Sequence, residues 1–513
     1  MDVFQKKNSF LKNHSNLQIF EEKRMRKIQE SQMQLGELDI SQIRFDLRSR
    51  DEIPKLLMGL QHLYATPQLR DSVFKILEKI IPNNRSKEKG RPGMTLWKIL
   101  VLGTLRLNCN WDYDKVHEMA NQHRTLRQMM GHGMLDDDLE YAIQTIKDNV
   151  HLLTPEILDE INILVVSEGH KLVMGKKKKT ILKGSCDSFV VETNVHFPTD
   201  INLLWDAIRK TIEMTGSFFE RYELDGWRQW KHQLKKIKGL FRKCQTLKHS
   251  NSKDDSKKEK KEKEIIVAYE AYLAAVEEQL CRAENSLKNI IEQISFVSAT
   301  NIKSYIDHAK RQIDQVRRRV VQDETIRHGE KVFSIFEEHT EWIVKGKAGV
   351  AQELGLLVNV VKDQFGFILH HKVVEKQKDV QVTVDMVKET QQRFPDLKAC
   401  SFDKGYYSSE NKENLEKILD HVILPKKGRL SKKDKEVESS PEFKESKKKH
   451  SAVEAAISTL ENHGLDRCCD HGRDGFKRYV ALAVAARNIQ HLGQQIQNRN
   501  IKQQNRVRSK KAA

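Results

Sequence analysis

Residues 397–407 read Leu-Lys-Ala-Cys-Ser-Phe-Asp-Lys-Gly-Tyr-Tyr, and this stretch decides the fold that we predict for the chain. Residues 397–402 form a short apolar run typical of a strand, and Gly405 marks the turn that leaves it. The run therefore delivers Asp403 at the end of a strand. A single carboxylate at a strand end does not indicate a function by itself, so the interpretation of Asp403 depends on the segments around it.

Two further segments each bring an acid. Upstream, residues 181–195 read Ile-Leu-Lys-Gly-Ser-Cys-Asp-Ser-Phe-Val-Val-Glu-Thr-Asn-Val, a β-rich run that carries Asp187. Downstream, residues 449–461 read Lys-His-Ser-Ala-Val-Glu-Ala-Ala-Ile-Ser-Thr-Leu-Glu, with apolar residues at the spacing of one helix face. Glu454 lies beside that face. Most glutamates on amphipathic helices are solvated surface residues. Glu454 becomes a candidate functional residue only together with the two aspartates upstream.

The order strand aspartate, strand-end aspartate, helix glutamate resembles the catalytic blocks of bacterial insertion-sequence transposases of the DDE type, and the ISNCY group above all. The resemblance covers residues 90–150, 183–206 and 331–492. It implies an α/β RNase H-like catalytic core with a large helical insertion, plus an all-α N-terminal DNA-binding region. It also implies that Asp187, Asp403 and Glu454 form the catalytic triad.

The implied chemistry is strand cleavage and then strand transfer, two in-line displacements at phosphorus. Two Mg²⁺ ions suit it, and Mn²⁺ can substitute, because hard cations take carboxylate oxygens and pairs of ions assist both the attacking and the leaving oxygen. We expect Asp187 to bridge the two ions and Asp403 and Glu454 to hold one each. Glu461 is the alternative third acid. Glu192, His196 and Asp200 are candidate helpers with structural roles as the simpler interpretation.

Charge and composition point to a polyanionic partner. The 513 residues carry a net charge of +18, with a pI near 9.3, which favours nucleic acid. The resemblance implies transposon end repeats and target DNA as partners, a homodimer or larger assembly on DNA, and a place in the bacterial cytoplasm with the nucleoid. No apolar run is long enough for a membrane span, so we expect no membrane partner.

Four regions are predicted. They are an N-terminal helical arm (1–65), a helix-turn-helix-like DNA-binding domain (66–174), the catalytic domain (175–493, with the insertion at about 203–330) and a disordered basic tail (494–513). A plain helical bundle is the alternative for 66–174. The insertion either dimerises the protein, holds DNA or only caps the core. Candidate DNA-binding residues are Arg91, Lys98, Arg106, Lys345, Lys347, Lys404, Lys447 and His450.

Within the catalytic domain the pattern predicts strands at 332–336, 355–361, 367–374, 397–402 and 422–424. Helices are predicted at 380–394 and 408–419, the second with Ser408 as N-cap, and a closing helix at 479–492. Residues 248–264 read as a charged, mobile connector. Residues 425–449, rich in lysine, read as an exposed loop or a disordered linker.

A DNA transposase is the favoured function. A nuclease of the same fold that cuts without joining, and a catalytically silent DNA-binding protein derived from a transposase, are the alternatives. Some related transposases place tyrosine, arginine and lysine around the glutamate, where this chain has Lys447, His450 and Glu461. The hairpin-forming route associated with that pattern is therefore not expected.

Overall fold

The computed structural model describes residues 24–25, 38–81, 91–133, 138–175, 181–249, 251–290, 294–344 and 352–512. The chain forms two compact units, Met1–Glu192 with Leu356–Ala513, and Thr193–Gly355. Each unit has its own cluster of buried apolar residues. Two strands, β3 (Leu182–Thr193) and β5 (Gln352–Asp363), connect the units through the chain.

A mixed sheet forms the centre of the first unit. Its other strands are β6 (Ile368–Val374), β7 (Leu397–Phe402), β8 (His421–Ile423) and the short β9 (Arg467–Cys468). The order is β5-β3-β7-β8, with β6 beside β5 and β9 beside β3. β7 runs parallel to both neighbours, and β6 is antiparallel to β5. Strands buried on both faces read as continuous apolar runs, which explains why 355–361 and 367–374 were recognisable.

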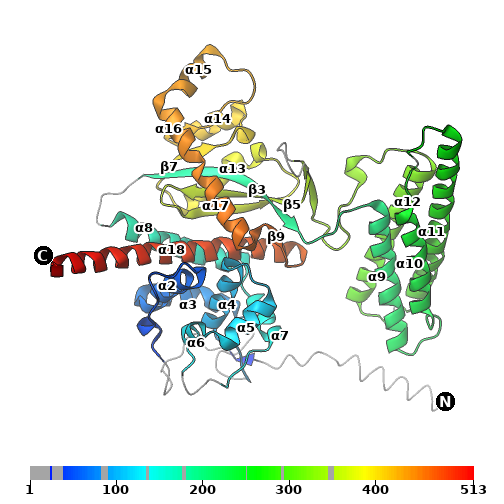
Figure 1. Ribbon diagram of the computed structural model, residues 1–513, viewed down its shortest axis with the longest axis horizontal. Helices are drawn as coiled ribbons and strands as arrows, with labels where there is room; N and C mark the ends of the chain where they lie inside the picture. Colours follow the sequence, from blue (N-terminus) through cyan, green and yellow to red (C-terminus); the bar gives the residue numbers. More distant parts are fainter. Residues whose placement is uncertain are drawn as a thin grey trace. The chain divides into compact units, whose positions relative to one another are not determined.

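Helices cover both faces of this sheet. α13 (Asp379–Arg393) packs against β6 and β7, while α8 (Pro155–Met174) and α18 (Gly472–Ala512) pack against β6 on the other side (Figure 1). α14 (Ser409–Glu416) follows β7, and the hydroxyl of Ser408 accepts a hydrogen bond from the Asn411 amide at 3.0 Å, as an N-cap does. The order from β3 to β8 is the one that the resemblance implies for an RNase H-like core.

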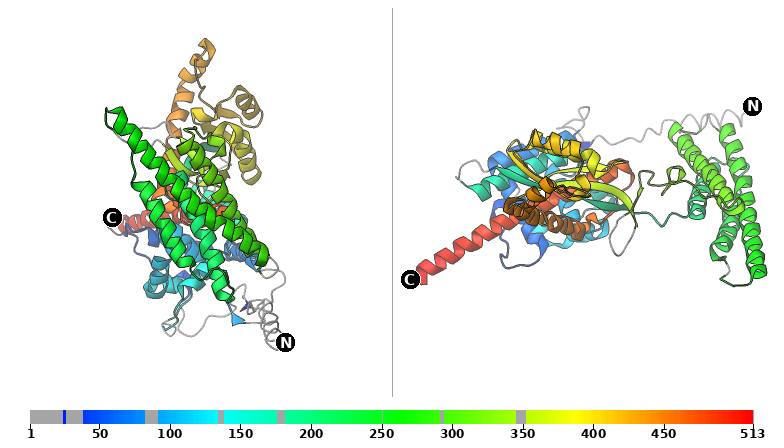
Figure 2. Two further views of the ribbon diagram at one scale, coloured as in Figure 1. Left: turned by 90° about the vertical axis from the view of Figure 1, so that its right-hand side faces the viewer. Right: turned by 90° about the horizontal axis from the view of Figure 1, so that it is seen from above.

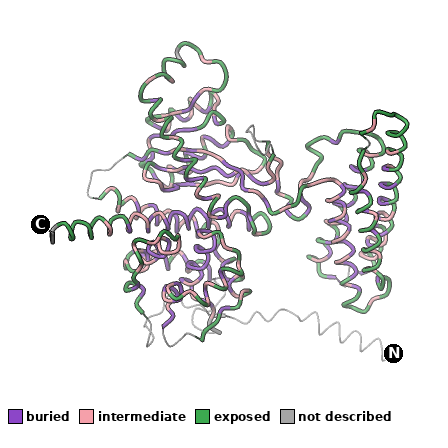
Figure 3. The backbone as a smooth tube through the Cα atoms, viewed as in Figure 1, coloured by how far each residue is buried: buried purple, intermediate pink, exposed green. Residues whose placement is uncertain are grey.

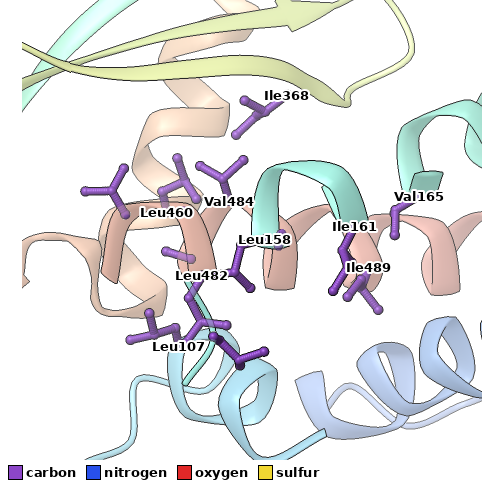
Figure 4. Packing of buried hydrophobic residues seen from close by; sticks show 14 of the residues in the cluster. Leu107, Leu158, Ile161, Val165, Ile368, Leu460, Leu482, Val484 and Ile489 are labelled. Atoms are coloured by element: carbon purple, nitrogen blue, oxygen red, sulfur yellow. The ribbon is translucent and has the colours of Figure 1, made fainter. Parts of the chain in front are cut away.

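The long helix α18 is the structural centre of the first unit. Residues 479–486 are buried on every side, because the sequence Tyr-Val-Ala-Leu-Ala-Val-Ala-Ala has no polar face. Leu482, Val484 and Ile489 pack with residues of α8 and β6 (Figure 4). A helix from the N-terminal region crosses α18 so closely that a Cβ on Gly493 would lie 1.8 Å from the carbonyl oxygen of Lys55. Only glycine fits there.

The N-terminal helices share that core. They are α2 (Glu52–Ala65), α3 (Pro67–Leu77), α4 (Leu96–Asn108), α5 (Tyr113–Gln122), α6 (Arg124–Met129) and α7 (Ile143–Val150). α2 and α4 pack directly on α18, whose residues are almost four hundred positions away in the sequence. Residues 66–174, predicted as a domain of their own, lie in the same compact unit as the sheet and the C-terminal helix. The C-terminal helix joins them to the sheet.

The second unit is a helical bundle made of α9 (Asp200–Arg221), α10 (Trp230–Thr246), α11 (Asp255–Ile290) and α12 (Phe296–Val321), which run alongside one another (Figure 2). Trp205 of α9 stacks on Phe241 of α10 with ring centroids 5.4 Å apart. This unit contains the predicted insertion at 203–330. The charged connector predicted at 248–264 is helical from Asp255 onward, since lysine and glutamate are good helix formers.

Three local expectations need correction. Residues 332–336 form bends, and the strand here is β4 (Glu341–Val344), antiparallel to β5. The lysine-rich stretch 425–449 contains α15 (Lys432–Ser439) and most of α16 (Pro441–His450), begun by Ser431 and Ser440 caps. The tail from residue 494 continues α18 as a helix to Ala512, and its residues 498–509 are mostly exposed (Figure 3). No helix of the described residues is long and apolar enough to cross a lipid bilayer.

Candidate active site

Asp187 and Asp403 lie side by side in the sheet. β3 and β7 are parallel, with Cys186 opposite Phe402 at the last pair of the register. Asp187 directly follows Cys186 in the sequence, and Asp403 directly follows Phe402. The pairing therefore brings residues 187 and 403 to neighbouring positions, where β7 ends and β3 continues, although more than two hundred residues separate them in the sequence.

The turn after β7 leaves the Asp403 side chain free. Asp403 is the N-cap of the short 3₁₀ helix Lys404–Tyr406, but its side chain makes no capping hydrogen bond and is exposed. Tyr406, two residues further on from Lys404, is buried, and its hydroxyl donates to Oδ1 of Asn359 in β5 at 2.5 Å. The backbone of the turn is therefore anchored while the carboxylate faces solvent.

Glu454 comes from α17 (Ala452–Leu460), which follows α16 across the sheet (Figure 1). Val453, Ala456 and Leu460 are buried, whereas Glu454 is exposed, as the helical spacing predicted. The turn before α17 is tied to the strands by a chain of hydrogen bonds. His450 Nδ1 lies 3.0 Å from Ser401 Oγ of β7, which in turn donates to Ser185 Oγ of β3 at 2.9 Å.

The electrostatics show that the acids influence one another. The pKa of Asp187 is raised to about 6, first by burial and then by the negative charges of Asp403, Asp379 and Glu454, against a hydrogen bond from the Ser188 amide. Neighbouring carboxylates and burial each disfavour the charged form of an acid. All three predicted triad residues therefore belong to one electrostatic cluster, and a cation would relieve its charge.

Asp379 is a fourth acid that sequence reasoning missed. It is the first residue of α13, and its Oδ2 accepts a hydrogen bond from Ser188 Oγ at 3.0 Å. Its pKa is raised by burial, while contacts with Ser188 and Asn359 lower it and the charge of Asp403 raises it further. The predicted helix began one residue later, and an acid in a first turn ordinarily only complements the helix dipole.

The carboxylate oxygens of these acids are the reason to expect a divalent metal ion at this site. Oδ1 of Asp379 is buried and makes no hydrogen bond of ordinary geometry, although the side chain of Asn359 lies near enough to lower the pKa of this carboxyl, and a buried carboxylate oxygen is stable only when something pairs with it. Asp187, Asp379, Asp403 and Glu454 all offer hard oxygen ligands of the kind that Mg²⁺ prefers. No three His, Cys, Asp or Glu side chains among the described residues already lie close enough together to hold an ion. Asp403 and Glu454, being exposed, can turn toward one without unpacking the core.

The candidate DNA-binding residues differ in their exposure and contacts. Lys404 and Lys447 are exposed, and Lys98 is half-buried with its ammonium 5.8 Å from the centre of the Tyr141 ring. Arg91 lies in the two-residue strand β2 (Arg91–Pro92), paired with β1 (Arg24–Met25). His450 has a lowered pKa because it is buried, so it is a neutral hydrogen-bonding residue at neutral pH and not a cation. Lys345 and Lys347 lie outside the described residues.

Arg106 requires a correction. Its side chain is 4% exposed and forms an ion pair with Asp470 at 2.9 Å, and its guanidinium lies 4.0 Å from the centre of the Tyr113 ring. Arg478 contacts the same carboxylate at 2.9 Å. The positive charge of Arg106 is therefore used inside the fold to join α4 to the start of α18, and it has no surface to offer to DNA.

The three candidate helpers all sit in ion pairs. Glu192 binds Arg467 at 2.9 Å, His196 lies 3.3 Å from Asp206, and Asp200 binds Arg319 at 2.5 Å. These contacts favour the structural interpretation of each residue. Glu461 is half-buried at the start of the π-helical stretch Glu461–Leu465, about two turns beyond Glu454.

Comparison with known families gives one match. Residues 314–489 match the model of a family described as Transposase DDE domain. The matched segment includes Asp379, Asp403 and Glu454, and Asp187 precedes it. It covers less than half of the chain. Neither the curated proteins nor the solved structures gave a match.

Proposed function

We propose that the protein is a DNA transposase that binds the ends of an insertion sequence and catalyses metal-dependent strand cleavage and strand transfer. The observation that carries the proposal is that Asp187, Asp403 and Glu454 come from three distant segments and lie near enough for the charges of Asp403 and Glu454 to raise the pKa of Asp187, while Asp403 and Glu454 are exposed. The match of 314–489 to a transposase domain supports it.

In this proposal each acid has a separate task. Asp187 is held on β3, so its carboxylate has the most fixed position and would bind both ions, while Asp403 and Glu454 would hold one each. When bound, two divalent ions activate the attacking oxygen and stabilise the leaving oxygen of a displacement at phosphorus. Asp379 and Ser188 fix the backbone beside Asp187. His450, neutral and hydrogen-bonded to Ser401, positions the turn before Glu454.

The partners follow from the same reaction. The substrate is the DNA of the element's end repeats, then target DNA, and the protein acts as a homodimer or larger assembly in the bacterial cytoplasm, with the nucleoid. The net charge of +18 supports a polyanionic substrate. Mg²⁺ is the expected ion, with Mn²⁺ as a substitute.

The decisive experiment compares the parent with Asp403→Asn on a labelled duplex that carries the element's own ends. We expect Mg²⁺- or Mn²⁺-dependent cleavage and joined products from the parent, and end binding without products from the variant. The change removes a charge but keeps the size of an exposed side chain, so folding should be preserved.

Other outcomes select the alternatives. Cleavage without joining, even with a pre-cut end, would identify a nuclease. End binding with no product from the parent, together with no ion in a metal titration, would identify a catalytically silent DNA-binding protein. Equal products from both proteins would remove Asp403 from the triad.

A further inference from the structure

Helix α10 of the second unit carries six basic side chains and no acidic one. They are Lys231, Lys235, Lys236, Lys238, Arg242 and Lys243, and all six are exposed. Ile237, Phe241 and Cys244 on the opposite face are buried in the bundle core. The orientation of α10 is thus fixed by apolar packing, and six of its exposed side chains are basic.

The basic side chains form a continuous band. Lys231, Lys235, Lys238 and Arg242 follow the spacing i, i+4, i+7 and i+11, which places them in one row along the helix. Lys236 and Lys243 form a second row beside it. At 1.5 Å of rise per residue the band is about 18 Å long. Duplex DNA carries about one phosphate charge per 1.7 Å of its axis, so a band of this length spans several phosphates.

Most of this charge is not used inside the protein. Lys231 binds Glu220 at 3.1 Å, and Lys238 lies 6.0 Å from the centre of the Trp205 ring. Among the described residues, Lys235, Lys236, Arg242 and Lys243 have no carboxylate within 4.0 Å. The neighbouring helix α12 behaves differently.

On α12 the three consecutive arginines are paired with acids, whereas Arg311 has no carboxylate within 4.0 Å among the described residues. Arg317 pairs with Glu277 at 2.8 Å, Arg318 with Glu324 at 2.6 Å and Arg319 with Asp200 at 2.5 Å. In the first turns of α11, four of the five lysines have an acid within 4.0 Å, and Lys260 does not. Among the described residues of the bundle, α10 therefore has the most cations without a carboxylate partner, and it carries no acid of its own.

We propose that the exposed face of α10 is a docking surface for the sugar-phosphate backbone of duplex DNA. This rests on the proposed function, which makes DNA the substrate. Unpaired, regularly spaced cations suit a polyanion with regularly spaced phosphates. An anionic membrane suits the face less well, because the apolar side of α10 is already buried and an interfacial helix needs that side for lipid. A protein partner would call for aromatic anchors, which this face lacks.

The test measures binding of the full chain to a fluorescein-labelled duplex of mixed sequence over a series of salt concentrations. The variant changes Lys235, Lys236, Arg242 and Lys243 to glutamine. The matched control changes Lys257, Lys258, Lys261 and Lys263 to glutamine, which removes the same charge from paired lysines of the same unit. We expect the α10 variant to lose tenfold or more in affinity. Its slope of log K against log salt should shrink by about 0.9 for each lost phosphate contact.

The control should keep most of the affinity and slope. Thermal melting confirms that both variants fold. Equal losses in the two variants, or an unchanged slope in the α10 variant, would overturn the proposal, as would a variant that loses binding to phosphatidylglycerol vesicles but not to DNA. A parent that binds the duplex through α10 but never cleaves it would defeat the proposed catalysis and leave the docking surface standing.

Discussion

Ser188 Oγ donates a hydrogen bond to Oδ2 of Asp379 across 3.0 Å, and this contact joins the start of α13 to the residue that follows Asp187. The other oxygen of Asp379 is buried and makes no hydrogen bond of ordinary geometry. Asn359, whose Oδ1 accepts from Tyr406, also lowers the pKa of Asp379. A partly buried acid at the start of α13 is therefore held against the central strand β3, beside the proposed triad.

We predict that Asp379→Asn impairs metal-dependent cleavage while the protein still folds. The amide keeps an oxygen for Ser188 but removes a negative charge near the ions, so the Mg²⁺ concentration needed for half-maximal cleavage should rise by about tenfold, or ~1.4 kcal/mol. Single-turnover cleavage over a Mg²⁺ series measures this.

Asp385→Asn is the matched control for Asp379. Asp385 lies on the same helix and is exposed. Its removal should leave the Mg²⁺ requirement unchanged. If the two variants behaved alike, Asp379 would have only a structural role.

The sequence predicts the local structure around the three acids. Asp403 follows the short apolar run that forms β7, Asp187 lies in the β-rich segment that forms β3, and Glu454 lies beside four buried residues of one helix face. Their catalytic roles are implied by the resemblance and stay a prediction. Asp379 could not be found in this way, since its role arises from a contact with Ser188, about two hundred residues away. Local patterns carry no information about such pairs.

The same limit explains the errors at larger scale. The helices at 66–174 look like a separate domain in the sequence because their partner α18 lies at the other end of the chain. Arg106 looked like a surface cation because Asp470, which neutralises it, is equally distant. Residues 425–449 looked disordered because they lack apolar residues, although Ser431 and Asp434 form a capping box that starts a helix.

Exchange of Glu454 for glutamine should reduce cleavage by about a hundredfold or more, ~3 kcal/mol, because a carboxylate ligand is lost from the proposed metal site. Glu461→Gln should leave cleavage within a few-fold of the parent. Glu461 begins the π-helical stretch after α17, whereas the charge of Glu454 is one of those that raise the pKa of Asp187. The reverse ranking of the two variants would make Glu461 the third acid.

Removal of the charge at Asp187 should stabilise the protein when no divalent ion is present. Asp187 is surrounded by three other acids, and Asp187→Asn relieves repulsion on the order of 1 kcal/mol. The variant should also lose the rise in Tm that saturating Mg²⁺ gives the parent, since a ligand stabilises only the state that binds it. Differential scanning calorimetry with EDTA and with Mg²⁺ tests both parts. A Tm of the variant that still rises with Mg²⁺ as in the parent would place the ion elsewhere.

The ion pair of Arg106 and Asp470 should be essential for stability rather than for DNA binding. Both side chains are about 95% buried, so Asp470→Asn leaves a buried guanidinium short of its counter-charge and should cost about 3–5 kcal/mol. Urea unfolding measures the cost. The double change Arg106→Met with Asp470→Asn should cost less than the sum of the two single changes, because the unpaired charge is gone. Additive losses would show that the pair is not coupled.

His491 should make the protein sensitive to mild acid. Burial, then the charge of Arg487, lowers its pKa to about 4, and its Nε2 lies 2.9 Å from the carbonyl oxygen of Phe365. Between the ordinary histidine pKa near 6.5 and that value, the unfolded chain binds a proton that the folded chain does not. The free energy of unfolding should therefore fall as pH decreases through this range, by about 3 kcal/mol at pH 4 from this residue alone. His491→Gln should flatten the profile, measured by urea unfolding from pH 7 to pH 4, whereas exchange of the exposed His249 for glutamine should not. A variant profile as steep as the parent's would mean that other buried histidines carry the effect.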